Sequence, residues 1–445
     1  MLDGFFLNED SRFSNYGESL AWLYNFRRIL PKRDLNGIKN LLEILGNPQE
    51  EFESIHITGT NGKGSTVAMI GSILKAEGFK VGIFTSPHLS RFTERIVIGE
   101  SEIPEADVLR LLESIRDVVD SAKPIRREIG FFDVVTALAF KYFSEKKVEI
   151  AVIEAGMGGR LDATNVLNPL ASVITNVSLE HTDILGKTVL EIAQEKAGII
   201  KKDGVLITAT DDDAVYSLFK EVCKRWKSRI YRVGSDIKYS RLDSRPEGQM
   251  FTVEGLKDVY EELFIPLLGY HQIKNASTAI GAVESLSIKG LNISRKAIYE
   301  GLAKSSWPGR LEIMHRKPLI LLDCAKDPEA VRSLKETLLN DFAFSKMIAI
   351  ISISSDKDIS SMIRYFSEVV DYFLITAHKV MGRAAEPSII AREVEKYSIP
   401  YGLAIDVKDA IQKALSLAED DDLICITGSV FLVGEARDLL RQVLS

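Results

Sequence analysis

Apolar positions recur along the chain in two patterns, one typical of helices and one typical of buried strands. Between residues 15 and 45 they return every three or four positions, which predicts two helical segments broken at Pro31–Asp34. The same spacing predicts helices at 63–76, 105–120, 134–143, 191–200, 268–286 and 295–304. Continuous apolar runs predict buried strands at 55–57, 80–84, 150–153, 171–177, 318–323, 347–352, 371–376 and 422–427. Strands that alternate with helices predict parallel α/β sheets.

The most natural division of the chain lies near residue 305. Ser305–Arg310 contains a proline and a glycine, which interrupt any helix. We therefore expect a larger domain over 1–304 and a smaller one over 305–445, because 445 residues exceed one comfortable core. Within the larger domain, 204–268 is expected to form strands and hairpins, with Asp211–Asp213 as a solvated helix start.

Composition excludes several classes of protein. A formal net charge of −7 argues against a nucleic-acid binder that works by bulk positive charge. The three cysteines are far apart, so neither a disulfide framework nor a thiolate zinc site is expected, and a reducing cytoplasm fits. No apolar run approaches the roughly 20 residues of a membrane helix, and the N-terminus does not read as a signal peptide. We expect a cytoplasmic monomer without nucleic-acid or membrane partners.

The stretch Ile55–Thr66 combines a short apolar strand, a glycine-rich turn and the start of a helix. Such a turn lets backbone N–H groups converge on an anion at the helix N-terminus, and Lys63 adds a full positive charge. Ser65 or Thr66 offers a hydroxyl to a phosphate-bound Mg²⁺. The general nucleotide-loop pattern has four residues between its glycines and a Ser or Thr after the Lys, whereas Gly64 follows the Lys here. A tight turn with an exposed lysine therefore stays an alternative.

Two further candidates stand at the ends of predicted strands. Glu154 directly follows the strand at 150–153, and His181 follows the strand at 171–177. A carboxylate at the carboxyl end of a buried parallel strand is well placed to bind a metal. A lone histidine is more often a hydrogen-bonding residue than a ligand, but its place after a strand makes His181 a candidate.

Two short motifs add a resemblance to a known family. Gly-Thr-Asn-Gly-Lys-Gly-Ser at 59–65 and Thr-Ser-Pro-His-Leu at 85–89 resemble the folylpolyglutamate synthase and dihydrofolate synthase branch of the Mur ligase family. Further matches follow in order from about residue 15 to 440. The resemblance implies a P-loop-containing, Mur-ligase-type α/β central domain with a parallel sheet over 1–304, which binds ATP and a pterin substrate. It implies a smaller, Rossmann-like C-terminal ligase domain over 305–445.

The implied activity is an ATP-dependent amide ligation that uses Mg²⁺ and passes through an acyl phosphate. L-Glutamate would be added to a folate and possibly to dihydropteroate. Two alternatives stay open at this point. One is a related Mur-type ligase acting on a modified pterin, and the other is a nucleotide-binding homologue without ligase activity.

The resemblance also implies a role for individual residues. Nucleotide binding would fall to Gly59, Thr60, Asn61, Gly62, Lys63, Gly64, Ser65, Thr66, Gln272, Asn275, Arg310 and Asp323. Magnesium would bind Ser86, Glu154 and His181. The pterin-bearing substrate would contact Phe92, Arg95, Phe132, Asp133, Asp162 and Ala163. Catalytic roles would fall to Lys63, His181 and Lys196. Lys196 is carbamylated in the family, although the residue pattern alone favours an ordinary surface lysine.

The chain departs from the family at several positions. The family usually has Asp-Gly-Ala-His-Asn-Pro where this chain has Asp323–Pro328, so that Lys326 and Asp327 replace two mostly neutral groups with permanent charges. Gly130 lacks a hydroxyl that the family usually has. Asp133 is one methylene shorter than the usual glutamate, and it is equally suited to cap a helix.

Overall fold

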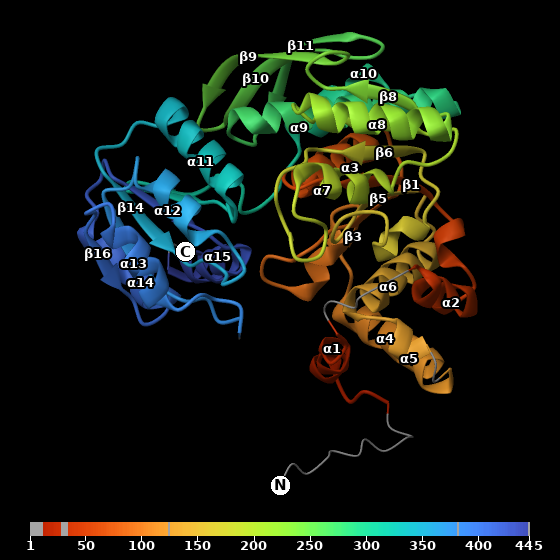
Figure 1. The fold of residues 1–445 in the computed structure, drawn as a ribbon, viewed down its shortest axis with the longest axis horizontal. Coiled ribbons are helices and arrows are strands. Elements are labelled where there is room, and N and C mark those ends of the chain that lie inside the picture. The colour runs from red at the N-terminus through yellow and green to blue at the C-terminus, as the bar shows by residue number, and fades with distance from the viewer. Residues whose placement is uncertain (1–11, 28–33, 123–124, 381, 444–445) are drawn as a thin grey trace.

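The computed structural model describes residues 12–27, 34–122, 125–380 and 382–443 (Figure 1). The predicted break at Pro31–Arg33 lies outside the described residues, and so does the N-terminal stretch up to residue 11. On either side of the break are α1 (Tyr16–Tyr24) and α2 (Asn36–Ile44), as the apolar spacing predicts. In the described ranges, no helix combines the length and apolarity needed to cross a bilayer.

The larger part of the molecule is built on an eight-stranded sheet. Its strands are, in spatial order, β4 (Ser101–Glu102), β3 (Ile96–Ile98), β2 (Val81–Phe84), β5 (Ile150–Glu154), β1 (Glu53–Thr58), β6 (Ala171–Ile174), β7 (Val205–Thr208) and β8 (Arg229–Arg232). The strands from β2 to β8 are parallel, and β3 and β4 add antiparallel pairs at one edge. Because β5, β1 and β6 are neighbours, the segments that follow them meet at one edge of the sheet.

Helices cover both faces of this sheet, which explains its continuous apolar strands. One face packs with α1, α2, α4 (Glu105–Ser121), α5 (Ile125–Glu128) and α6 (Phe131–Glu145). The other face packs with α3 (Lys63–Ala76), α9 (Tyr270–Ser285) and α10 (Arg295–Ala303). Along β5, Ala151 and Ile153 belong to the first core, and Ile150 and Val152 belong to the second.

The prediction for residues 204–268 is wrong in one respect. Strands β9 (Lys238–Arg245), β10 (Gly248–Glu254) and β11 (Val259–Ile265) form the expected antiparallel hairpins, but α8 (Asp213–Trp226) precedes them. Asp212 caps α8 by accepting the N–H groups of Ala214 and Val215, so the predicted helix start is confirmed. The apolar spacing inside α8, which packs against α7 (Val189–Ala197), was the signal for the rest of the helix.

The smaller part contains a six-stranded sheet. Its strands are, in spatial order, β12 (Glu312–Arg316), β13 (Leu319–Leu322), β17 (Leu423–Thr427), β14 (Met347–Ile351), β15 (Tyr372–Ile375) and β16 (Tyr401–Leu403). All pairs are parallel except that of β12 with β13. Its helices are α11 (Pro328–Asp341), α12 (Ile359–Phe366), α13 (Pro387–Glu395), α14 (Val407–Leu417) and α15 (Val430–Val443). The four predicted strands are confirmed, and the two unpredicted ones are partly exposed edge strands without a continuous apolar run.

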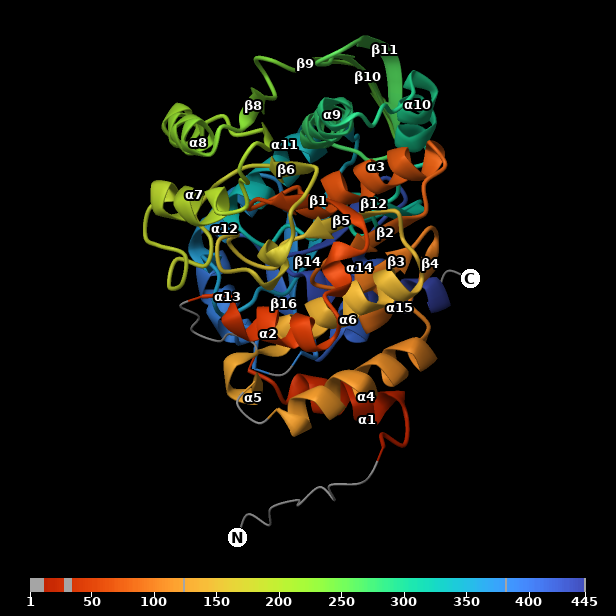
Figure 2. The same ribbon diagram turned by 90° about the vertical axis from the view of Figure 1, so that its right-hand side faces the viewer.

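The two parts face each other across a cleft of about 1330 Å³. The larger part lines it with the β1–α3 turn and the segments after β2, β5 and β6. The smaller part lines it with the β13–α11 turn and with α11. The α1, α4 and α5 helices lie at one end of the molecule and the β9–β11 sheet at the other (Figures 1 and 2). The carboxyl ends of strands therefore meet in the cleft, as expected of ligand sites in open α/β sheets.

Candidate active site

The turn between β1 and α3 has the geometry of an anion-binding loop. Gly62 precedes α3 with a left-handed backbone (φ 81°), and no side chain caps the helix. The first-turn N–H groups are therefore not consumed by a capping side chain, and they carry the positive end of the helix dipole. The loop lines the cleft from Thr60 to Ser65, whereas Thr66 is fully buried. Of the two hydroxyl candidates, only Ser65 reaches the cleft.

Steric crowding explains the glycines of this loop. A Cβ atom on Gly59 would lie 1.8 Å from Thr175 Oγ1, and Gly59 also has a positive φ of 152°. A Cβ atom on Gly64 would lie 2.7 Å from the indole of Trp307, which comes from the segment between the two sheets. The glycine that departs from the general loop pattern is thus required by contact with that segment.

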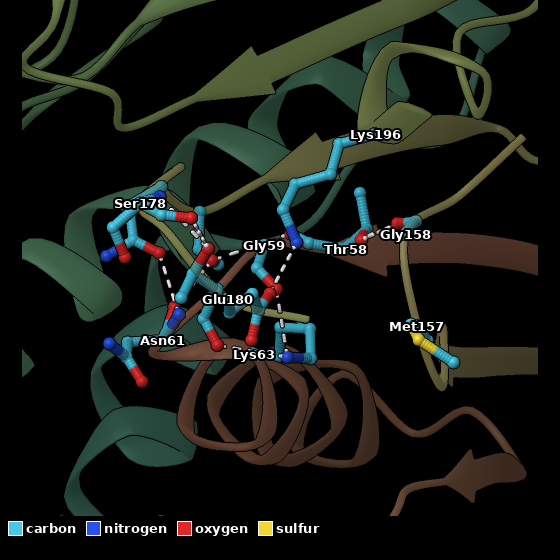
Figure 3. Close-up of polar contacts among 12 residues, drawn as sticks. Thr58, Gly59, Asn61, Lys63, Met157, Gly158, Ser178, Glu180 and Lys196 are labelled. Atoms are coloured by element: carbon cyan, nitrogen blue, oxygen red, sulfur yellow. Dashed lines mark hydrogen bonds and ion pairs between the residues drawn. The ribbon is translucent and has the colours of Figure 1, made fainter. Parts of the chain in front are cut away.

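The side chain of Lys63 folds back over the loop (Figure 3). Its Nζ donates hydrogen bonds to the carbonyl oxygens of Gly59 at 2.9 Å and Thr60 at 3.1 Å. The end of β6 braces the same loop, because Asn176 Oδ1 accepts the Asn61 N–H at 2.8 Å. Sequence reasoning missed Asn176. The sequence feature that could have identified Asn176 is a polar side chain just beyond β6, a strand that neighbours β1.

Ser86 and Glu154 lie together in the cleft. The Ser86 N–H donates to Glu154 Oε2 at 3.0 Å, and the Glu154 carboxylate is nearly buried. Burial raises the pKa of Glu154, and the charge of Lys63 opposes that shift. In the described ranges, no group of three or more His, Cys, Asp or Glu side chains gathers as a metal site.

His181 is not joined to this pair. It has a left-handed backbone (φ 47°), and no hydrogen bond between described residues links it to Ser86 or Glu154. Burial lowers its pKa to about 4, so the imidazole is neutral at physiological pH. Among the described residues, a hydrogen bond thus joins two of the three predicted metal ligands, and none joins His181 to them.

Lys196 forms a buried ion pair with Glu180. Nζ of Lys196 lies 2.8 Å from Glu180 Oε1, and in Figure 3 the Glu180 carboxylate lies between the ends of Lys196 and Lys63. The alternative of an ordinary surface lysine is wrong, because Lys196 is fully buried. Burial lowers its pKa to about 8. Burial raises the pKa of Glu180, but the charges of Lys196 and Lys63 outweigh it and hold that pKa well below its ordinary range.

The residues expected near the nucleotide base and ribose also line the cleft. Gln272 and Asn275 share a face of α9, as their spacing predicts, and Asn275 Nδ2 donates to Gln272 Oε1 at 3.0 Å. On the opposite wall, Asp323 follows β13 and accepts the N–H groups of Leu311 at 3.0 Å and Ala325 at 2.9 Å. Burial raises the pKa of Asp323, and the charge of Arg310 opposes that shift.

The residues expected to contact the pterin lie elsewhere. Among the described residues that line the cleft, none belongs to this set. The guanidinium of Arg95 lies over the Phe92 ring at 5.9 Å and the Phe131 ring at 5.6 Å, and Nε donates to His88 Nδ1 at 2.8 Å. Phe132 stacks on Phe84, with ring centroids 5.8 Å apart. These aromatic groups belong to the core that α6 makes with the sheet.

Two aspartates that were predicted to contact the substrate instead accept hydrogen bonds from backbone N–H groups. Asp133 Oδ2 accepts the Gly130 N–H at 2.8 Å in a capping box at the start of α6, which is the capping role that the sequence left open. Asp162 accepts the N–H groups of Met157 at 2.9 Å and Thr164 at 3.0 Å. Ala163 follows Asp162 and is buried.

Comparison with known proteins identifies the family. Residues 57–283 match the Mur ligase middle domain, and residues 309–430 match the Mur ligase glutamate ligase domain. The dihydrofolate synthase/folylpolyglutamate synthase of Bacillus subtilis is 33% identical over 436 residues, which cover 96% of this chain and 100% of that protein. The chain belongs to the folylpolyglutamate/dihydrofolate synthase branch of the Mur ligases. The expected family, two-domain α/β fold class and ligase activity are thereby confirmed.

Other Mur ligases give the same result. The folylpolyglutamate synthase of Lacticaseibacillus casei is 33% identical, with 96% of this chain and 99% of that protein covered. A structure of Mycobacterium tuberculosis folylpolyglutamate synthase complexed with ADP superposes with a TM-score of 0.89 at 33% identity, covering 96% of this chain and 98% of that one. The matches to the two family domains leave residues 284–308 unassigned, so the predicted boundary at 304/305 stays a prediction.

One contact across this Mur ligase cleft was not predicted. Asp327, which the sequence marks only as a departure, accepts the Asn61 side-chain N–H at 3.2 Å. The same oxygen of Asp327 accepts the Ala330 N–H at 2.9 Å and caps α11. A single carboxylate thus joins the C-terminal domain to the phosphate-loop candidate. Because 266 positions separate Asn61 from Asp327, no local sequence pattern predicts that the two side chains form a hydrogen bond.

Proposed function

We propose that this Mur ligase adds L-glutamate to a folate, and also to dihydropteroate, at the expense of ATP. The observation that carries the proposal is the convergence of an uncapped helix N-terminus, Lys63 and the Ser86–Glu154 pair in one interdomain cleft. The full-length similarity to folylpolyglutamate and dihydrofolate synthases supports the choice of substrates. The comparisons favour neither a modified pterin nor a homologue without ligase activity.

The phosphate loop would hold the triphosphate of ATP. Backbone N–H groups at the start of α3 and the Lys63 ammonium neutralise its charge, with Gln272 and Asn275 toward the base. Arg310 and Asp323 on the opposite wall would reach the triphosphate and the ribose. Because both walls contribute, closing the cleft also excludes water from the reacting groups.

The residues of the cleft fit a magnesium ion. The Glu154 carboxylate and the Ser86 hydroxyl are oxygen ligands of the kind that Mg²⁺ prefers, and both line the cleft. His181 would complete the set in its neutral form, the form that burial favours. When bound, Mg²⁺ would neutralise phosphate charge. Lys63 and the loop N–H groups orient the terminal phosphate.

The chemistry has two steps. A carboxylate oxygen of the pterin substrate forms a bond to the terminal phosphorus while the bond from that phosphorus to the β,γ-bridging oxygen breaks, and ADP leaves with the electron pair. The amine of glutamate then attacks the acyl carbon, phosphate leaves, and the amine loses a proton to give the amide. Both steps need stabilisation of developing negative charge, which the loop and its lysine supply, and neither needs a protein nucleophile.

We also propose that Lys196 is carbamylated, its neutral amine adding CO₂ and releasing a proton. Burial lowers its pKa to about 8, which raises the fraction of reactive amine, while Glu180 stabilises the ammonium. Carbon-13 NMR with labelled bicarbonate should give a carbamate resonance that is absent from Lys196→Ala. A spectrum without that resonance at pH 8 would contradict the modification.

A substrate panel tests the proposed function. Purified protein is incubated with ATP, Mg²⁺, L-glutamate and either dihydropteroate, tetrahydrofolate or other pterins. We expect ADP release that requires both pterin and glutamate, and a product heavier by one or more glutamate residues. Products from modified pterins alone would support the related ligase, and ATP binding without any product would support the inactive homologue. Monomeric state and cytoplasmic location stay predictions.

A further inference from the structure

Lys326 lies in the turn between β13 and α11, on the C-terminal wall of the cleft, and its side chain is partly buried. Its neighbour Asp327 holds this turn against the phosphate loop through Asn61, two residues before Lys63. Lys326 is also a residue at which the chain departs from its family, where a histidine is usual. An amine that can carry a full positive charge therefore stands where the family usually has a mostly neutral group.

The charges around Lys326 come from both walls of the cleft. Burial, followed by the charge of Lys63, lowers the pKa of Lys326, and the charge of Glu180 opposes that shift. In the part of the chain that the structure describes, no carboxylate lies within ion-pair distance of Lys326. Glu180 is already paired with Lys196 at 2.8 Å, and the side chain of Asp327 is engaged by Asn61 and the α11 N-terminus.

Lys63 and Lys326 thus line one cleft from opposite domains, on two turns that the Asn61–Asp327 hydrogen bond joins. Like charges that face each other at a partly buried site repel, and an anion between them removes the repulsion and gains from both. Lys63 belongs to the phosphate loop, so the anion it meets is a phosphoryl group. Because both lysines line one cleft and the Asn61–Asp327 hydrogen bond holds their two turns together, the geometry points to the same phosphoryl group for both lysines.

We propose that Lys326 is a second phosphoryl-binding lysine, which the C-terminal domain places opposite Lys63 to contact the terminal phosphate of ATP. This inference rests on the proposed function. Lys326 stabilises the negative charge that develops as the phosphorus moves from the bridging oxygen to the substrate carboxylate. The phosphate loop alone binds the inner phosphates, so ADP does not depend on Lys326.

A binding experiment separates this role from others without turnover. We expect Lys326→Gln to weaken the magnesium complex of a non-hydrolysable ATP analogue by about 10-fold in calorimetry, and ADP by less than about 2-fold. Lys326→Arg should restore most of the analogue affinity. The control is Lys335→Ala, which removes a lysine of the helix that follows the turn, α11, where Lys335 pairs with Glu368 at 2.8 Å. Equal loss of both nucleotides, or loss of neither, would overturn the proposal.

A single-turnover experiment tests the chemical step. Full-length enzyme, ATP, Mg²⁺ and the pterin substrate are mixed without glutamate, and ADP is measured after rapid quench. We expect Lys326→Gln to slow ADP formation by about 100-fold or more, with partial rescue in Lys326→Arg. An unchanged ADP burst with a raised KM for glutamate would overturn the proposal and assign Lys326 to the carboxylate of the amino acid.

Folding and function remain distinguishable in these tests. Circular dichroism and thermal melting of each variant show whether the chain folds, and Lys326→Met serves as a second neutral variant if the glutamine variant does not. If the wild-type protein makes no product with any pterin, the proposed function fails. A selective loss of the ATP analogue would in that case still support Lys326 as a phosphoryl-binding residue.

Discussion

The two walls of the cleft hold charged groups in different ways. The central wall is the side of the cleft that the larger domain forms, and its functional candidates follow neighbouring parallel strands. Backbone geometry sets their positions, because Gly62 immediately precedes α3 and Glu154 is the last residue of β5. On the C-terminal wall, Asp323 and Asp327 each accept backbone N–H groups of the C-terminal domain. This difference leads us to expect that the central wall can bind an anion by itself, whereas the C-terminal wall contributes only when it is correctly docked.

Few polar contacts set that docking. Asp327 bonds to Asn61 near the phosphate loop, and Arg241 of β9 donates to both carboxylate oxygens of Asp341 at 2.9 Å. Both bonds come from Nη1 of Arg241, and the Asp341 carboxylate is almost fully buried, whereas the Arg241 side chain is partly exposed. Substitutions on the central wall should therefore affect stability or chemistry directly, and those on the C-terminal wall should affect how the walls meet.

The largest effect is expected from breaking the buried ion pair of the central wall. In protein prepared without CO₂ or bicarbonate, so that Lys196 carries no carbamate, Glu180→Gln leaves the buried Lys196 ammonium without its partner, and unfolding in urea should show a loss of about 3–5 kcal/mol. A loss below about 1 kcal/mol would mean that the pair is solvated. In that case, breaking a contact of the central wall would cost no more stability than breaking a contact of the C-terminal wall.

Acidification sharpens this prediction. The pKa of Glu180 is held well below its ordinary value of 4.5 in the folded protein, because Lys196 and Lys63 outweigh its burial. Below pH 4.5 the unfolded chain binds a proton at Glu180 that the folded protein does not bind. The stabilisation from Glu180 is therefore complete above pH 4.5 and is lost as the pH falls. The stability difference between wild type and Glu180→Gln should shrink in the same window.

The next effect concerns chemistry rather than stability. Lys63→Ala removes the charge of the phosphate loop, and kcat/KM for ligation should fall by about 10²–10³-fold, or about 2.7–4 kcal/mol. Lys80→Ala, on an exposed lysine after α3, is the control. Turnover of Lys63→Ala within about threefold of wild type would show that the loop is not the phosphate site.

A smaller effect is expected on the C-terminal wall. Asp327→Ala removes both the cap of α11 and the acceptor of Asn61, which should cost about 1–2 kcal/mol in thermal unfolding. Asp327→Asn keeps an oxygen acceptor and should stay close to wild type. If both variants lose the same stability, the negative charge of Asp327 matters more than its hydrogen bonds.

The smallest effect is expected from an exposed pair next to the site. Asp183 and Lys187 pair at 2.7 Å, but their side chains are 92% and 72% exposed. Asp183→Asn should leave the unfolding midpoint unchanged within error, because solvent screens such pairs. A shift as large as that of Glu180→Gln would contradict burial as the source of the difference.

The sequence predicts the central wall better than the C-terminal wall for a physical reason. Continuous apolar strands reveal the parallel sheet, and residues that follow such strands meet at one edge, so Glu154 and the phosphate loop were expected together. Burial of Lys196 and the contact of Asp327 with Asn61 arise only in the tertiary fold. The sequence signal for His181 was equally good, but among the described residues no hydrogen bond links it to Glu154, so its role as a metal ligand stays a prediction.

The contact of Trp307 with Gly64 gives the molecule an optical reporter. Its indole comes from the interdomain joint and lies against the first turn of α3, beside the place proposed for phosphate. The other two tryptophans lie in different environments. Trp22 is buried among aromatic rings, and Trp226 is 45% exposed at the end of α8. We therefore expect the ultraviolet emission of Trp307 to change when a nucleotide binds and when the domains close, without any attached dye.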